Sequence, residues 1–235
     1  MASLVVRRGD GSCEVLKDCE KKMAAFCAID AYVDYDVGGR PQDPNVITKR
    51  QVHAANRAMR ARSSNAAWQA LLGDPPREVD KLKGICADLD LIETSDEEWY
   101  GEVKGKLESL YRRVMGVTGI GAASGTKVLH LMRPRLVAIA DSVVVGYLSI
   151  AAADKVSTAL ATAAAIRQIG RTEGNGATLS AVQEYLRTAG VIEADVVPSA
   201  CRIIDALLWM RANGVQRPEQ AGYHRLWRVM GLSSP

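Results

Sequence analysis

Signals that begin and end helices recur along almost the whole chain, and they constrain the fold more than any other feature of the sequence. Thr48 with Gln51, and Ser95 with Glu98, have the spacing of a capping box, in which each side chain binds the orphan backbone N–H of the other residue. Gly and Pro residues stand where helices are expected to end or begin. Helices are expected over about residues 13–31, from 48, and over 64–72, 77–88, 95–115, 121–133, 142–150, 154–169, 180–190 and 198–214, with a last one from 218.

Composition supports the same fold class. Aromatic residues make up 5% of the chain and include a single Phe, so Ala, Leu, Val and Ile must fill the core. Behind Ser95, an apolar stripe recurs at helical spacing; it consists of Trp99, Val103, Leu107, Leu110 and Val114. Only residues 4–6 and 137–139 resemble strands, and both runs are short. The sequence therefore predicts an all-α fold.

Several classes of protein are disfavoured. The longest uncharged run, Ser142–Ala153, is too short to cross a bilayer, and no secretion signal opens the sequence, so we expect a cytoplasmic protein with no membrane partner. The five cysteines form no CxxC pair and the three histidines show no ligand spacing, so we expect no disulfide framework, no metal and no cofactor. A net charge of +3 permits a nucleic-acid partner without requiring one.

A tight Gly-Ile-Gly turn joins two of the expected helices. The first helix ends near Met115, and the second begins directly after the turn and runs to Arg133. The first N–H groups of the second helix are orphans that can bind an anion, and nearby hydroxyls and an amine add polar groups. We predict contacts with DNA phosphates here; the residues are Gly119, Ile120, Gly121, Ala122, Ser124, Thr126 and Lys127. The alternative is a purely structural turn between two helices.

The segment from the turn to Asp141 resembles the helix-hairpin-helix element of the DNA glycosylase superfamily, which contains endonuclease III, the adenine mismatch glycosylase and the 8-oxoguanine glycosylase. In that family the second hairpin helix leads to an Ile/Val-rich segment and then to a catalytic Asp that opens the next helix. Here Leu136–Ala140 leads to Asp141 at the family's spacing, with the hairpin at about 116–133. The resemblance is firm over about residues 99–148. It implies two helical subdomains, 43–136 with the hairpin and 1–42 plus 137–235 with the aspartate, and a cleft between them.

The sequence also departs from the family. Members with lyase activity carry a Lys at the second residue after the turn, where this chain has Ala123, so no Schiff base with the sugar is expected. Lys127, one helical turn further on, is the alternative amine. The family's iron–sulfur loop is absent, because only Cys201 follows the aspartate. The resemblance therefore indicates a bacterial branch without the Schiff-base lysine or the iron–sulfur loop.

The resemblance implies a monofunctional DNA glycosylase. Asp141 would stabilise the positive charge that develops on the sugar while a modified base is held outside the helical stack. The partner would be double-stranded DNA containing a damaged base or a hypermodified base of invading phage DNA, and we expect the protein to act as a monomer. Without the resemblance, Asp141 is predicted to be an ordinary helix N-cap, and capping is compatible with the catalytic role. The rival function is a helix-hairpin-helix module that binds DNA without catalysis.

Residues for the base pocket are predicted from the available aromatic and polar groups. Tyr32, Tyr35 and Asp36 belong to or flank the polar stretch from Asp34 to Asn45, and Trp68 is a further aromatic in the first half. The alternative is that this stretch is an ordinary surface loop. Asp205 lies in an apolar run and needs a partner, for which Arg202 three residues earlier is suited. A structural Arg202–Asp205 pair is therefore expected, and the alternative is that Asp205 faces the cleft.

Overall fold

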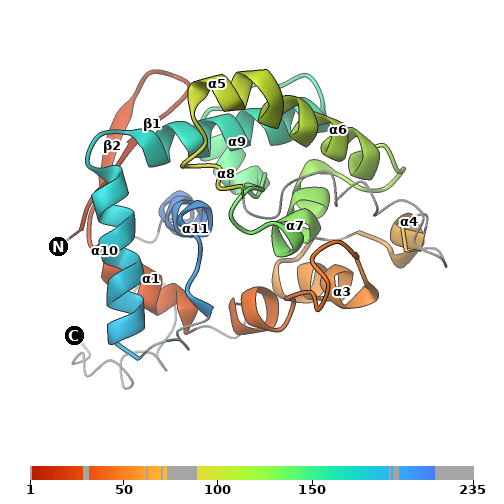
Figure 1. The fold of residues 1–235 in the computed structure, drawn as a ribbon, viewed down its shortest axis with the longest axis horizontal. Helices are drawn as coiled ribbons and strands as arrows, with labels where there is room; N and C mark the ends of the chain where they lie inside the picture. The colour runs from red at the N-terminus through yellow and green to blue at the C-terminus, as the bar shows by residue number, and fades with distance from the viewer. Residues whose placement is uncertain are drawn as a thin grey trace.

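The computed structural model describes residues 2–28, 32–61, 63–69, 71–72, 89–190, 192 and 196–214. Over these ranges the protein is mostly helical, which confirms the predicted fold class at that level (Figure 1). The helices are α1 (Cys19–Cys27), η1 (Val33–Val37), α3 (Lys49–Ala58), α4 (Asn65–Gln69), α5 (Asp96–Glu98), η3 (Trp99–Val103), α6 (Lys104–Met115), α7 (Ala122–Met132), α8 (Ser142–Tyr147), α9 (Lys155–Arg171), α10 (Asn175–Thr188) and α11 (Ala200–Ala212). The helices expected at 77–88 and from 218 lie outside the described residues.

Helix α11 lies in the middle of the molecule (Figure 1). It packs against α8 and α9 on one side and against α1 on another, and α6 and α7 also pack against α9. The buried apolar side chains form one continuous cluster, and the stripe from Trp99 to Val114 lies within it as predicted. The division into two subdomains stays a prediction.

Both predicted capping boxes are confirmed. Gln51 Oε1 accepts a hydrogen bond from the backbone N–H of Thr48 at 2.9 Å, and the backbone N–H of Glu98 donates to Ser95 Oγ at 3.1 Å. Asp154 caps α9 by accepting from two backbone N–H groups. These ends agree with the sequence because each cap is a contact between residues two or three apart.

Three local predictions are wrong. Cys13–Leu16 is a strand, β2, and not part of a helix; it pairs antiparallel with β1 (Leu4–Arg7), and Leu4 lies opposite Leu16. The loop expected after Asp34 begins with the helical turn η1. Helix α10 begins at Asn175 and not at Ser180, because Gly174 has a positive φ of 82° that ends the preceding segment. The side chain of Asn175 then binds both backbone groups of Val5, which ties the sheet to α10.

Candidate functional site

Asp141 caps α8 and also lines a pocket. Its Oδ1 accepts a hydrogen bond from the backbone N–H of Val143 at 3.0 Å, so the cap predicted for this residue is present. Its Oδ2 lies 2.6 Å from Lys127 Nζ. The side chain of Asp141 is 17% exposed, and that exposed part faces a pocket of about 680 Å³. Capping therefore fixes the carboxylate without burying it.

We refer to this hollow as the Asp141 pocket. Its size is typical of pockets that hold small molecules. Three aromatic side chains line it: Phe26 of α1, Tyr32 just before η1 and Trp209 of α11. Its lining consists of Phe26, Tyr32, Ala58, Met59, Arg60, Ala61, Ala123, Lys127, Ile139, Asp141, Ser142, Val143, Arg202, Asp205, Trp209 and Asn213.

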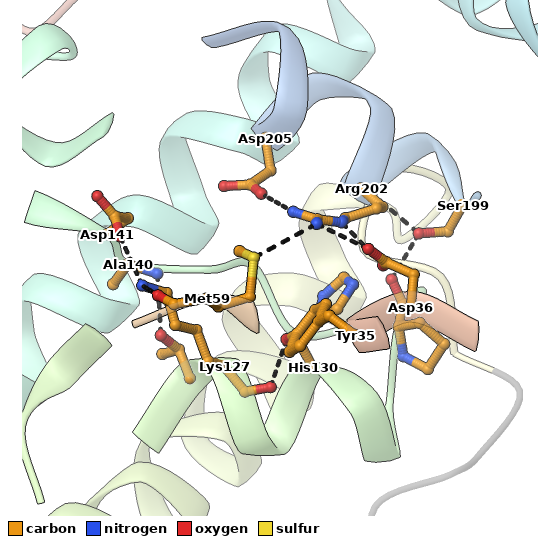
Figure 2. Close-up of polar contacts among 12 residues, drawn as sticks. Tyr35, Asp36, Met59, Lys127, His130, Ala140, Asp141, Ser199, Arg202 and Asp205 are labelled. Carbon is orange, nitrogen blue, oxygen red and sulfur yellow. Dashed lines mark hydrogen bonds and ion pairs between the residues drawn. The ribbon is translucent and has the colours of Figure 1, made fainter. Parts of the chain in front are cut away.

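Helix α7 holds the segment that leads into Asp141 (Figure 2). The Nδ1–H of His130 donates to the carbonyl of Val137 at 2.6 Å, and Thr126 Oγ1 accepts from the backbone N–H of Ala140 at 3.0 Å. Lys127 Nζ donates to the carbonyl of Met59 at 2.8 Å as well as to Asp141. Three side chains on one helix thus fix the backbone before Asp141 and the carboxylate itself.

These contacts change the predicted role of two residues, Thr126 and Lys127, which were expected to bind phosphate. Thr126 is fully buried, and its hydroxyl also donates to the carbonyl of Ala122 at 2.7 Å. Lys127 is 3% exposed and turns inward, because its aliphatic stem packs within the core while its amine reaches Asp141. Neither side chain is available to a phosphate outside the protein. Both act instead as positioning residues for Asp141.

The Gly-Ile-Gly turn between α6 and α7 has the expected tight geometry. Gly119 has a φ of +88°, so only glycine takes this conformation without strain. Ile120 and Ser124 are both buried, and Ser124 Oγ accepts a hydrogen bond from the backbone N–H of Gly121 at 3.0 Å. The side chains of Ile120 and Ser124 therefore serve the turn. Because the N–H of Gly121 is taken by Ser124, a contact with phosphate would come from the backbone N–H groups of the exposed Gly119 and the half-buried Ala122.

Sequence reasoning missed a cation beside this turn. Lys155, at the start of α9, donates from its amine to the carbonyl of Ile120 at 3.1 Å. The two residues are 35 positions apart, so no local pattern indicated the contact. The start of α7 and the amine of Lys155 together give this corner a positive character.

Of the four residues predicted for the base pocket, the structure brings only Tyr32 to the Asp141 pocket. Tyr35 is fully buried, and its hydroxyl donates to the carbonyl of Lys127 at 2.5 Å. Trp68 lies in the core, where its Nε1 donates to Ser63 Oγ at 2.7 Å. Asp36 lines a different pocket of about 640 Å³ on the other side of Arg202. Tertiary packing turns Tyr35 and Trp68 into the core and places Asp36 at the other pocket, and a base-binding role for the four residues stays a prediction.

A buried triad separates the two pockets (Figure 2). Arg202 donates to both oxygens of Asp36 at 2.9 and 2.8 Å, and to Asp205 Oδ2 at 2.5 Å. The Arg202–Asp205 pair predicted from the sequence is therefore confirmed. Asp36, 166 residues away in sequence, was not predicted as a partner. Although burial opposes its charge, the two carboxylates raise the pKa of Arg202.

The neighbouring His130 is uncharged near neutral pH. Burial lowers the pKa of His130 to about 4, and Arg202 acts in the same direction. The ring stacks on that of Tyr35, with 6.3 Å between the centroids. A neutral imidazole donating through Nδ1 is therefore a fixed part of the support under Asp141, and it adds no charge to the site.

The described residues give no sign of a metal centre or a membrane span. Within the ranges that the structure covers, no group of three or more His, Cys, Asp or Glu side chains is placed to hold a metal ion. No helix in that part of the chain is long and apolar enough to cross a membrane.

The fold and the site define a mostly helical protein in which a capped aspartate, paired with a lysine, lines an aromatic-walled pocket. The chain belongs to DUF6308, a family of unknown function that matches residues 19–212. No curated protein and no solved structure matches the chain.

Proposed function

We propose that the protein is a monofunctional DNA glycosylase that hydrolyses the N-glycosidic bond of a modified base and leaves an abasic site. The observation that carries the proposal is the carboxylate of Asp141, held by a cap and by Lys127 at the wall of a pocket of about 680 Å³. Glycoside hydrolysis needs such a carboxylate because positive charge develops on the sugar as the base leaves.

The pocket supports this proposal in its size and its walls. Trp209, which is half-buried, offers a ring surface on which an extruded base can stack, and the buried rings of Phe26 and Tyr32 also line the pocket. Ala123, in the first turn of α7, also lines the pocket, so the helix that begins at the Gly-Ile-Gly turn reaches the same hollow as Asp141. A strand held at that turn by its phosphates would thus lie close to the carboxylate.

Within the proposal, Asp141 is the catalytic residue and Lys127 positions it. The ion pair fixes the position of the carboxylate, and a carboxylate beside C1′ stabilises the developing charge and orients the attacking water. Double-stranded DNA with a damaged or phage-type hypermodified base is the proposed substrate.

A screen for released bases tests the proposal. The protein is incubated with duplexes that carry single modified bases and with hypermodified phage DNA, and free bases are identified by mass spectrometry while alkali cleaves any abasic sites. We expect release from at least one substrate, with strand breaks that depend on the alkali. DNA binding without release from any substrate would instead favour a non-catalytic binding module.

Borohydride trapping separates hydrolysis from lyase chemistry. We expect no covalent protein–DNA adduct, because Lys127 Nζ donates to Met59 and pairs with Asp141, and an ammonium in that state has no lone pair for attack on the sugar. The measurement is a denaturing gel after reduction, with the Lys127→Met variant as control. An adduct that forms in the unsubstituted protein and disappears in Lys127→Met would show that the amine forms an imine, and the protein would then be a lyase as well.

A substitution at Gly121 tests the phosphate contact. Gly121 has extended backbone angles, and a Cβ there would meet only Ser124 Oγ at 4.0 Å, so Gly121→Val should fold. Its side chain would stand before the exposed N–H groups, and losing charge-assisted hydrogen bonds should raise the Kd for DNA by roughly tenfold or more, whatever the base. Gly105→Val, at the far end of α6 with open space around it, is the control. Equal weakening by both variants, measured by fluorescence anisotropy, would contradict a contact at the turn.

A further inference from the structure

Asp205 is a buried carboxyl group with one oxygen left without a partner. It lies on α11 and is 2% exposed. Its Oδ2 accepts from Arg202 at 2.5 Å, whereas Oδ1 has no hydrogen-bond partner among the residues that the structure describes. Leaving a buried acceptor unsatisfied costs free energy, so a group of this kind calls for an explanation.

The position of Asp205 supplies one. Asp205 lines the Asp141 pocket, whereas Asp36, the other carboxylate on Arg202, lines the pocket on the opposite side. In Figure 2 the guanidinium of Arg202 lies between the two, and Asp205 is on the side of Asp141. A molecule that fills the Asp141 pocket therefore lies beside this carboxyl group, whose buried Oδ1 has no partner within the described part of the chain.

The charges around Asp205 decide what this oxygen offers. Burial raises the pKa of Asp205 to about 6. The charges of Arg202 and Lys127 act against this shift, whereas the charge of Asp141 acts in the same direction as burial. Cys201 on the same helix and Tyr35 on η1 also interact with Asp205, and both are uncharged because burial raises the pKa of each well above its usual value. At pH 8 Asp205 is therefore a carboxylate, which accepts hydrogen bonds and donates none.

We propose that Asp205 selects the occupant of the Asp141 pocket by accepting a hydrogen bond through Oδ1 from an exocyclic amine, so that the pocket takes a base of the adenine or cytosine kind. An oxo group at the same place would put a second acceptor beside Oδ1, and no hydrogen bond could form between the two oxygens. Sites built around a buried polar group reject ligands that leave it unpaired. This inference rests on the proposed function for the statement that the occupant is a base.

Deoxynucleosides with and without the amine test the inference directly. The probes are 2′-deoxyadenosine against purine 2′-deoxyriboside, and 2′-deoxycytidine against the 2′-deoxyriboside of 2-pyrimidinone. Calorimetric titration of the full chain at pH 8 should show binding about tenfold or more tighter for the amine-bearing member of at least one pair, as expected for a hydrogen bond to a charged group.

Asp205→Asn converts the contact. The Asn carbonyl would take the place of Oδ2 and accept from Arg202, so its NH₂ would replace Oδ1 and turn an acceptor into a donor. The variant should therefore prefer the oxo compounds 2′-deoxyinosine and 2′-deoxyuridine over the corresponding amines, which reverses the order of the unsubstituted protein. Asp36→Asn is the matched control. It weakens the other ion pair of Arg202, at the opposite pocket, and should leave the preference for amine-bearing probes unchanged.

Three results would overturn the inference: no binding of any amine-bearing probe, equal binding within both pairs, or an order that Asp205→Asn leaves as it was. The comparison in the unsubstituted protein decides the matter if the variant does not fold. Base release from DNA is measured in parallel. Release with no amine preference removes only the role of Asp205, whereas an amine preference without release from any DNA keeps that role and removes the glycosylase.

Discussion

Asp141→Asn should lower the rate of base release by about 10²–10⁴-fold, which is the range for removing a group that stabilises charge or moves a proton in the transition state. Asn is as good an N-cap as Asp, so the bond to the backbone of Val143 and the start of α8 should survive. The variant removes the charge that pairs with Lys127 but keeps a side-chain oxygen that can accept a hydrogen bond. The measurement is the single-turnover rate of formation of alkali-sensitive sites on the substrate that the base-release screen identifies.

A second capping aspartate provides the control for that experiment. Asp154 accepts from the backbone N–H groups of Val156 and Ser157 at the start of α9, and it does not line the Asp141 pocket. Asp154→Asn should keep the rate within a few-fold of the unsubstituted protein. If both variants released base at the full rate, or if both lost it together, Asp141 would be a structural cap and the glycosylase proposal would fail.

Arg202→Met should destabilise the fold by about 3–5 kcal/mol, because it leaves the carboxylates of Asp36 and Asp205 buried without their cation. The measurement is the free energy of unfolding from urea titration monitored by circular dichroism. An exposed pair provides the contrast: Arg187→Met removes the partner of Glu184 on the surface of α10 and should cost roughly 0–1 kcal/mol.

A rescue experiment identifies the cause of the loss at Arg202. Adding Asp36→Asn and Asp205→Asn to Arg202→Met removes the two uncompensated charges, so the triple variant should regain much of the lost stability. If the triple variant were no more stable than Arg202→Met, the loss would come from packing of the arginine side chain against Phe26 and Tyr35, whose rings lie 5.0 and 5.4 Å from the guanidinium carbon.

Local patterns predicted much of the helical structure because the responsible contacts span few residues. The caps at Thr48 and Ser95 and the Arg202–Asp205 pair each join residues three apart. The strand β2 was predictable in the same way. Gly9–Ser12 is a turn sequence between two short apolar runs, and the spacing 4–7 and 13–16 indicates a hairpin. The charged and amphipathic character of residues 13–31 favours a helix there instead.

The candidate site was less predictable. The sequence indicated Asp141 and the Gly-Ile-Gly turn, but it suggested that Lys127 faces outward with the start of its helix. A lysine at this position can either lie on an exposed helix face or form a buried ion pair. Only the position of Asp141 in the folded structure distinguishes these two arrangements. Phe26 and Trp209 come to the pocket from α1 and α11, and no spacing in the sequence connects these helices with Asp141.

The amino-acid sequence by itself determined where most helices begin and end, the left-handed turn that requires Gly119, and the cap that Asp141 provides, because backbone hydrogen bonds and φ limits act over a few residues. Tertiary structure alone decided that Lys127 pairs with Asp141, that Asp36 pairs with Arg202 across 166 residues, and that Oδ1 of Asp205 has no partner among the residues that the structure describes. Buried charges must find partners wherever packing brings them together, and the partner is chosen by distance in space and not by distance along the chain.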